Sequence, residues 1–314
     1  MRLIVQPEDG VVPVVAGIRS AKKTLDMPIF RLDHIEVDKA IKSAVKRGVI
    51  VRTLIAHTNT GGEKGLRKLE QRLLATGATV SRTADDLVRY HNKFMIIDGK
   101  TLFVMGFNYT HLDIDRSRSF GIIATNRRLV QEAVKLFDAD FNRQPYEAGM
   151  KQFLVSPENS RAELAAFLRG ARKQLLIYDV RITDNAMIRI LRERAKAGVE
   201  IKMMGKLQKK DLDVLVEKFP GKLHARAIIQ DGKKAFIGSQ SLRRLELDER
   251  REVGVIFNDE PIVRQLVSVF ESDWAETDTG KKELEEMNET AMHKAMEKAK
   301  KAKRKAKQQK KKRK

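Results

Sequence analysis

Short apolar runs alternate with amphipathic stretches along most of the chain, as expected for strands that alternate with helices. The predicted strands span residues 24–30, 49–56, 93–97 and 102–106, and then 174–180, 200–204, 227–230 and 235–238. The predicted helices span residues 36–47, 64–75, 127–141, 160–170, 185–197, 209–219 and 261–274. Gly48 and Gly198 each follow a helix and precede a strand, as helix-ending glycines do. The pattern predicts an α/β fold.

The second half of the chain repeats the first. His91, Lys93 and Asp98 return 133 residues later as His224, Arg226 and Asp231. At the same offset, Gly106 to Asn108 match Ser239 to Ser241. Each motif aspartate is followed by glycine between two apolar runs, which predicts a hairpin turn. Two matched half-sites predict one active site shared by the halves, so that no oligomer is required to complete it.

Upstream of the motifs the halves align through Gly48 and Gly198, and the first half has 17 extra residues before its histidine. We predict a first α/β repeat over residues 1–147 and a second over 148–279, each with a mixed sheet flanked by helices. Connections are expected at 142–151 and 277–281. Residues 280–314 form a Lys-rich tail, expected to be helical at first and then disordered in part.

Charge is concentrated at the C-terminal end of a chain whose formal net charge is +21. Between Lys298 and Lys314 there are 12 basic residues and no acidic ones. Such a segment either contacts a polyanion, such as an anionic membrane surface, nucleic acid or the ribosome, or stays solvated. The absence of cysteine excludes disulfides and thiolate chemistry. Without a signal peptide or an apolar run of membrane-spanning length, a cytoplasmic location is expected, with peripheral membrane association through the tail.

The repeated residues suit the cleavage of a phosphodiester. A histidine can attack phosphorus, and a second can protonate the departing alkoxide. The charge that accumulates on the phosphate oxygens calls for cations and hydrogen-bond donors. The candidates for this task are Lys93, Arg226, Asn108, Ser239 and Ser241.

These residues resemble the phospholipase D superfamily, which has two His-x-Lys-x4-Asp motifs, each followed by Gly-Ser-x-Asn. The resemblance covers both halves and implies two repeats related by a pseudo-twofold axis, with one site between them and no metal or other cofactor. It implies that His91 is the nucleophile, that His224 is the general acid and base, and that Glu252 supports His91. Asp98 and Asp231 would be structural, bonded locally at the hairpins.

The chain departs from the family pattern at several positions. Ser119 stands where a carboxylate would support His224, and Asp113 or Asp115 is the candidate substitute. Met105 and Ser241 replace consensus residues as well. His34, His57, His111 and His293 have no spacing typical of metal ligands and are interpreted as surface or local hydrogen-bonding residues.

The leading hypothesis is a metal-independent phosphodiesterase that hydrolyses or transfers a phospholipid headgroup. A nuclease or DNA-end phosphodiesterase is the alternative, because the same chemistry attacks a nucleic-acid backbone. A catalytically weak adaptor that binds nucleic acid or membranes is the second alternative.

Overall fold

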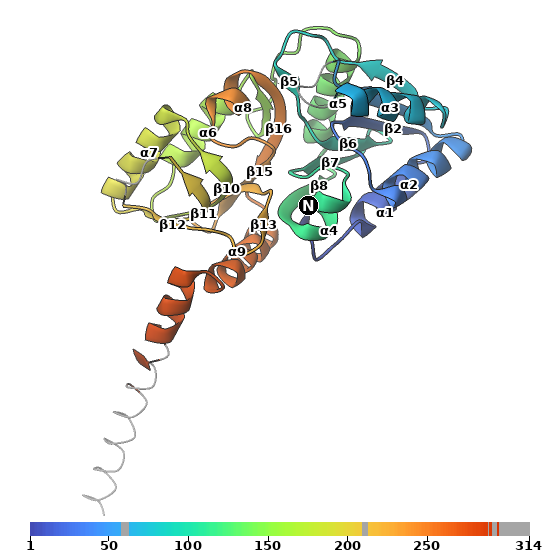
Figure 1. Cartoon of the computed structure of the whole chain (residues 1–314). Helices are drawn as coiled ribbons and strands as arrows, with labels where there is room; N and C mark the ends of the chain where they lie inside the picture. Colours follow the sequence, from blue (N-terminus) through green and yellow to red (C-terminus); the bar gives the residue numbers. More distant parts are fainter. Residues whose placement is uncertain (58–62, 209–212, 288, 291–293, 295–314) are drawn as a thin grey trace, which may run out of the picture.

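The computed structural model describes residues 1–57, 63–208, 213–287, 289–290 and 294. Within these residues the strands form two eight-stranded sheets, which belong to two neighbouring lobes (Figure 1). The first sheet has the order β1-β8-β7-β6-β2-β3-β4, and β13 pairs with β8. The second has the order β12-β11-β10-β14-β15-β16-β5, and β9 pairs with β16. In each sheet one parallel strand pair, β2 with β3 or β10 with β11, adjoins antiparallel pairs, so both sheets are mixed.

The strands from the first half of the chain are β1 (Arg2–Gln6), β2 (Thr24–Ile29), β3 (Ile50–Ile55), β4 (Thr79–Arg82), β5 (Arg89–Tyr90), β6 (Phe94–Ile97), β7 (Thr101–Met105) and β8 (Ser117–Ala124). Those from the second half are β9 (Phe153–Ser156), β10 (Gln174–Ile182), β11 (Glu200–Leu207), β12 (Leu215–Glu217), β13 (Lys222–Leu223), β14 (Arg226–Gln230), β15 (Lys234–Gly238) and β16 (Arg250–Phe257). The helices are α1 (Val12–Ser20), α2 (Ile35–Lys46), α3 (Glu63–Leu74), α4 (His111–Arg116), α5 (Arg127–Phe141), α6 (Ser160–Arg169), α7 (Asn185–Lys196), α8 (Arg244–Asp248) and α9 (Glu260–Ala275).

This arrangement confirms the predicted α/β class and the two repeats. The path β8-β7-β6-β2-β3 in one half has its counterpart in β16-β15-β14-β10-β11 in the other. Gly48 and Gly198 both have φ +83°, a backbone conformation that glycine adopts without strain and that ends α2 and α7. The predicted connection over residues 142–151 is also present, because no helix or strand is assigned between Asn142 and Met150. The exact boundaries between repeats and tail stay a prediction.

The predicted hairpins are present at both motif aspartates. Asp98 and Gly99 have φ of 52° and 60°, and Asp231 and Gly232 have φ of 55° and 62°. Two successive residues with positive φ are typical of the two-residue turn that joins antiparallel strands, here β6 to β7 and β14 to β15.

Two predicted elements are wrong. The helix predicted over residues 209–219 is replaced at Leu215–Glu217 by strand β12, which pairs with the open edge of β11, while residues 209–212 lie outside the described residues. The run of apolar residues from Val214 to Val216 suits an edge strand, and pairing with β11 overrides the weak helical period. The connection predicted over residues 277–281 is short, because helix resumes at residue 278. The disordered part predicted for the tail falls largely outside the described residues.

The two lobes share one hydrophobic core. Phe94, Phe120 and Phe137 of the first half belong to the same buried cluster as Tyr178 and Phe270 of the second. Helices α5 and α9 contribute to this cluster, whereas α1 and α2 cover the outer face of the first sheet. The site therefore lies between halves that are packed against each other without a flexible hinge. No described helix has the length and apolar character needed to cross a bilayer.

Candidate active site

Each motif histidine is fixed by the last strand of the opposite half. β5, just before His91, pairs in parallel with β16, and β13, just before His224, pairs in parallel with β8. The backbone N–H of His91 donates to the carbonyl of Arg251 at 2.8 Å, and that of His224 donates to the carbonyl of Arg118 at 3.0 Å. Because each half holds the other half's histidine, one chain builds the whole site.

His91 lies against a buried carboxylate. Its Nδ1 is 2.9 Å from both carboxylate oxygens of Glu252, whose side chain is fully buried. An N–H at Nδ1 that donates to Glu252 leaves the lone pair on Nε2, where Lys93 Nζ lies 3.0 Å away. Burial, together with the charges of Lys93 and Arg226, lowers the pKa of His91 well below its usual value. His91 is therefore a neutral imidazole with its nucleophilic nitrogen facing the cations.

His224 has a different carboxylate partner. Its Nδ1 lies 3.2 Å from Oδ2 of Asp113, a close but imperfectly aligned contact. The same oxygen accepts the backbone N–H of Asn108 at 2.9 Å and its side-chain amide at 2.6 Å. Burial opposes ionisation of Asp113, but these partners hold its pKa well below its usual range. Asp113, on α4, thus stands in for the carboxylate missing at Ser119, whose hydroxyl lies 3.3 Å from the carbonyl of His224.

The two motif cations occupy equivalent places. Lys93 Nζ donates to the carbonyl of His91 at 2.7 Å, and Arg226 Nη1 donates to the carbonyl of His224 at 3.0 Å. Burial lowers the pKa of Lys93 to about 7, although Glu252 opposes the shift. Both cations can turn toward a phosphate without leaving the cleft.

The three predicted phosphate-binding residues lie beside these groups, but their side chains already have protein partners. Ser241 Oγ accepts a hydrogen bond from Arg226 Nε at 3.3 Å, and the amide of Asn108 is held by Asp113. The hydroxyl of Ser239 accepts the backbone N–H of Val253 at 3.2 Å. Substrate contact by these side chains stays a prediction.

The motif aspartates are structural, but the prediction that they bond locally is wrong. Asp98 accepts the backbone N–H groups of residues 22–24 at the start of β2, and Asp231 accepts those of residues 172–174 at the start of β10. Each carboxylate therefore joins its hairpin to a strand remote in sequence. The tight turn directs the side chain away from its own backbone and toward these donors.

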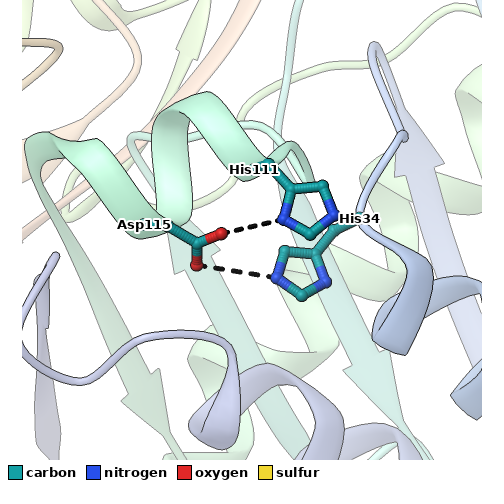
Figure 2. A group of neighbouring side chains, drawn as sticks. All are labelled: His34, His111 and Asp115. Carbon is teal, nitrogen blue, oxygen red and sulfur yellow. Dashed lines mark hydrogen bonds and ion pairs between the residues drawn. The ribbon is translucent and has the colours of Figure 1, made fainter.

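His34, His111 and Asp115 come together on the far side of α4, which the sequence spacing did not indicate (Figure 2). Asp115 lies 2.8 Å from Nδ1 of His111 and 3.6 Å from Nε2 of His34. These are possible metal ligands. However, Nδ1 of His34 accepts the backbone N–H of Glu36 at the start of α2. The ring proton is then on Nε2, which faces Asp115 as a donor rather than a ligand. We interpret the group as a clamp that fixes α4.

Sequence reasoning missed the arginines whose backbone carbonyls hold the histidines. Arg118 and Arg251 are 133 residues apart, as are their partners Asp140 and Asp273. Arg251 pairs across the interface with Asp140 at 3.0 Å, and Arg118 pairs with Asp273 at 2.8 Å. The repeat register contained this signal, but neither residue type suggests chemistry by itself.

Comparison with known proteins agrees with the fold and the motifs. Residues 14–141 and 164–274 match the family model described as cardiolipin synthase, phospholipase D-like domain. The chain belongs to this phospholipase D-like family. It is 33% identical over 128 residues to a mitochondrial cardiolipin hydrolase of Danio rerio, covering 38% of this chain and 53% of that protein. It is 26% identical over 235 residues to a probable cardiolipin synthase of Bacillus subtilis, covering 60% of this chain and 47% of that protein. The chain thus spans about half the length of these curated relatives.

Two solved structures share the fold. A polyphosphate kinase from Porphyromonas gingivalis has a TM-score of 0.70 at 18% identity over 86% of this chain and 49% of that one. A phosphatidylserine synthase from Haemophilus influenzae has a TM-score of 0.67 at 10% identity over 87% of this chain and 86% of that one. At these identities the likeness concerns the fold alone.

The contact between Asp113 and His224 can be tested by removing one charge. We expect Asp113→Asn to lower kcat by about 100-fold, within the usual contribution of general acid–base catalysis, because His224 loses the carboxylate that favours its protonated form. The pH at which kcat falls should also move to lower values. The measurement is kcat against pH on a soluble phosphodiester. Ser119→Ala, which removes no charge, should cost less than about threefold. Equal losses in both variants would show that Asp113 does not position His224.

Proposed function

We propose that this protein cleaves or exchanges the headgroup of a phospholipid through a phosphohistidine at His91, without a metal ion. The observation that carries the proposal is the unequal pair of buried histidines, each held by the opposite half. His91 has its pKa lowered well below the usual value, whereas Asp113 counteracts the lowering at His224. The first therefore suits a nucleophile and the second a proton donor.

The proposed steps balance as follows. Nε2 of His91 attacks phosphorus, the bond from phosphorus to the headgroup oxygen breaks, and His224 gives its proton to that oxygen. Water or another alcohol, deprotonated by His224, then attacks the phosphohistidine and restores His91. Lys93 and Arg226 neutralise the charge on the phosphate oxygens in both transition states. The family and the names of the two curated relatives support a lipid substrate over a nucleic acid.

The experiment that tests this function is headgroup release from mixed anionic vesicles with a chelator present. We expect release that persists in chelator, because both histidines act through nitrogen and no step uses a metal. Single-stranded and duplex DNA with labelled ends serve as competing substrates in parallel. Cleavage of DNA without any release of headgroup would overturn the lipid assignment in favour of the nuclease alternative.

The Lys-rich tail is the proposed contact with anionic membranes. Each lysine near such a surface contributes about 1 kcal/mol before screening, so twelve suffice for peripheral binding. A chain that ends at Met287 should bind anionic vesicles much more weakly at low salt. Equal binding by both chains would contradict this role.

A fall in activity above neutral pH is expected from Lys93. Its pKa of about 7 means that the ammonium is present below pH 7 and is lost as the pH rises, while the phosphodiester stays anionic throughout. The attraction therefore disappears on the basic side, and kcat/KM should fall by about tenfold per pH unit there. Lys93→Arg keeps its charge at every pH tested and should make the fall shallower. An identical profile from pH 5 to 9 in both proteins would contradict this origin.

A further inference from the structure

A cavity of about 430 Å³ opens next to His91. Its walls come from the loop after β2, from one face of α3 and from the residue that caps α4, Thr110. Phe30 lines the cavity, and its ring centroid lies 4.4 Å from that of His91. A molecule in this cavity is therefore separated from the reacting nitrogen by one side chain.

The floor of the cavity is aliphatic and its rim is cationic. Leu32, Leu66 and Leu69 are buried and line it, while Arg31 and Lys68 line it from exposed positions. Among the described residues, neither cation has an ion-pair partner, and Arg31 lies over the ring of Phe30. These two positive charges remain available to a ligand.

The other charged groups of the lining are already engaged. Arg72 pairs with Asp38 at 3.1 Å and donates to the carbonyl of Leu32 at 2.7 Å. The carboxylate of Asp33 accepts the backbone N–H of His111 at 2.9 Å. The cavity therefore presents a net positive charge above an apolar surface.

The walls are fixed before any ligand arrives. The clamp formed by His34, His111 and Asp115 ties the loop after β2 to α4 (Figure 2). The remaining wall, α3, belongs to the stretch by which the first half exceeds the second, so the cavity breaks the symmetry of the site. A specificity pocket on one side of a pseudo-twofold centre distinguishes the two ends of a substrate.

We propose that this cavity binds the headgroup of the substrate lipid, and that this headgroup is a glycerol carrying a second phosphate. The inference rests on the proposed lipid-cleaving function. The carbons of glycerol would pack on the leucines, and the second phosphate would lie between Arg31 and Lys68. A nucleobase fits less well, because Phe30 is buried and cations or His91 lie against its ring, which leaves no open face for stacking.

The test is calorimetric titration of the full-length His91→Ala chain with sn-glycerol 3-phosphate. We expect binding that weakens at least tenfold in His91→Ala/Lys68→Glu. The matched control is His91→Ala/Lys46→Glu, since Lys46 is an exposed lysine in the last turn of α2 and the change in net charge is the same. It should bind as the parent does. No binding by the parent, equal weakening in both variants, or tighter binding of a dinucleotide would overturn the inference.

The active chain gives a second readout. Lipids with glycerol phosphate as headgroup should have a kcat/KM at least tenfold above those with glycerol, and Lys68→Glu should remove this preference mainly through KM. Loss of preference in Lys46→Glu as well would contradict the assignment. The titration uses a chain without the nucleophile, so it stays interpretable if no lipid is cleaved. A failure of the proposed function is thereby distinguished from a failure of this inference.

Discussion

His91→Ala is expected to lower kcat for headgroup release by about four orders of magnitude, which corresponds to about 5.4 kcal/mol of transition-state stabilisation. The reason is that the substitution removes the attacking nitrogen and with it the covalent route, whereas the cations remain in place. The measurement is the single-turnover rate of release from vesicles. Acid-labile, base-stable phosphate should be trapped on the wild-type protein and not on the variant.

The matched control for this variant is His57→Ala. His57 follows β3, and its backbone N–H is bonded to Thr83. Its ring lies outside the group formed by His91, His224, Lys93 and Glu252, so a change below about twofold is expected. Phosphate trapped on His224 instead of His91, or unchanged turnover in His91→Ala, would contradict the assignment of the nucleophile.

The second large effect is expected at Arg251, on stability. Its guanidinium is buried and contacts Asp140 of α5 at 3.0 Å, Glu158 at 2.5 Å and the carbonyl of Ser156 at 3.2 Å. Arg251→Met would leave Asp140, only 3% exposed, without its cation. Breaking a buried pair in this way costs about 3–5 kcal/mol of unfolding free energy. The measurement is urea unfolding followed by far-ultraviolet circular dichroism.

Two further variants show whether this loss comes from the unpaired charge. Arg264→Met removes an exposed ion pair with Glu260, which is worth less than about 1 kcal/mol. Arg251→Met/Asp140→Leu removes both buried charges and should recover part of the stability that the single variant loses. If Arg251→Met and Arg264→Met unfold at the same urea concentration, the cross-interface pair does not stabilise the protein.

Arg251 also connects stability with the site. Its carbonyl holds the backbone of His91, and Arg118 does the same for His224. Loss of either buried pair would loosen the strand that positions the opposite histidine. We therefore expect Arg251→Met to lose activity at urea concentrations at which the helical signal is still intact.

The sequence by itself determined the fold class, the two repeats and the identity of the motif residues. This was possible because hydrophobic periodicity, helix-ending glycines and Asp-Gly turns are local signals, and because a duplication repeats them in register. His91, His224, Lys93, Arg226 and Glu252, far apart in the chain, were selected in this way and lie together in the structure.

The tertiary structure decided which partner each of these groups has. The carboxylate for His224 comes from Asp113 rather than from the equivalent of Glu252, because the turn of α4 brings it into the cleft. Asp98 and Asp231 join strands that the sequence left unconnected, and β12 forms because β11 offers it an open edge. Long-range pairing also places Phe30 and α3 around a cavity on one side of the site. Such contacts depend on how the halves pack, and packing between segments distant in the chain leaves no local pattern in the sequence.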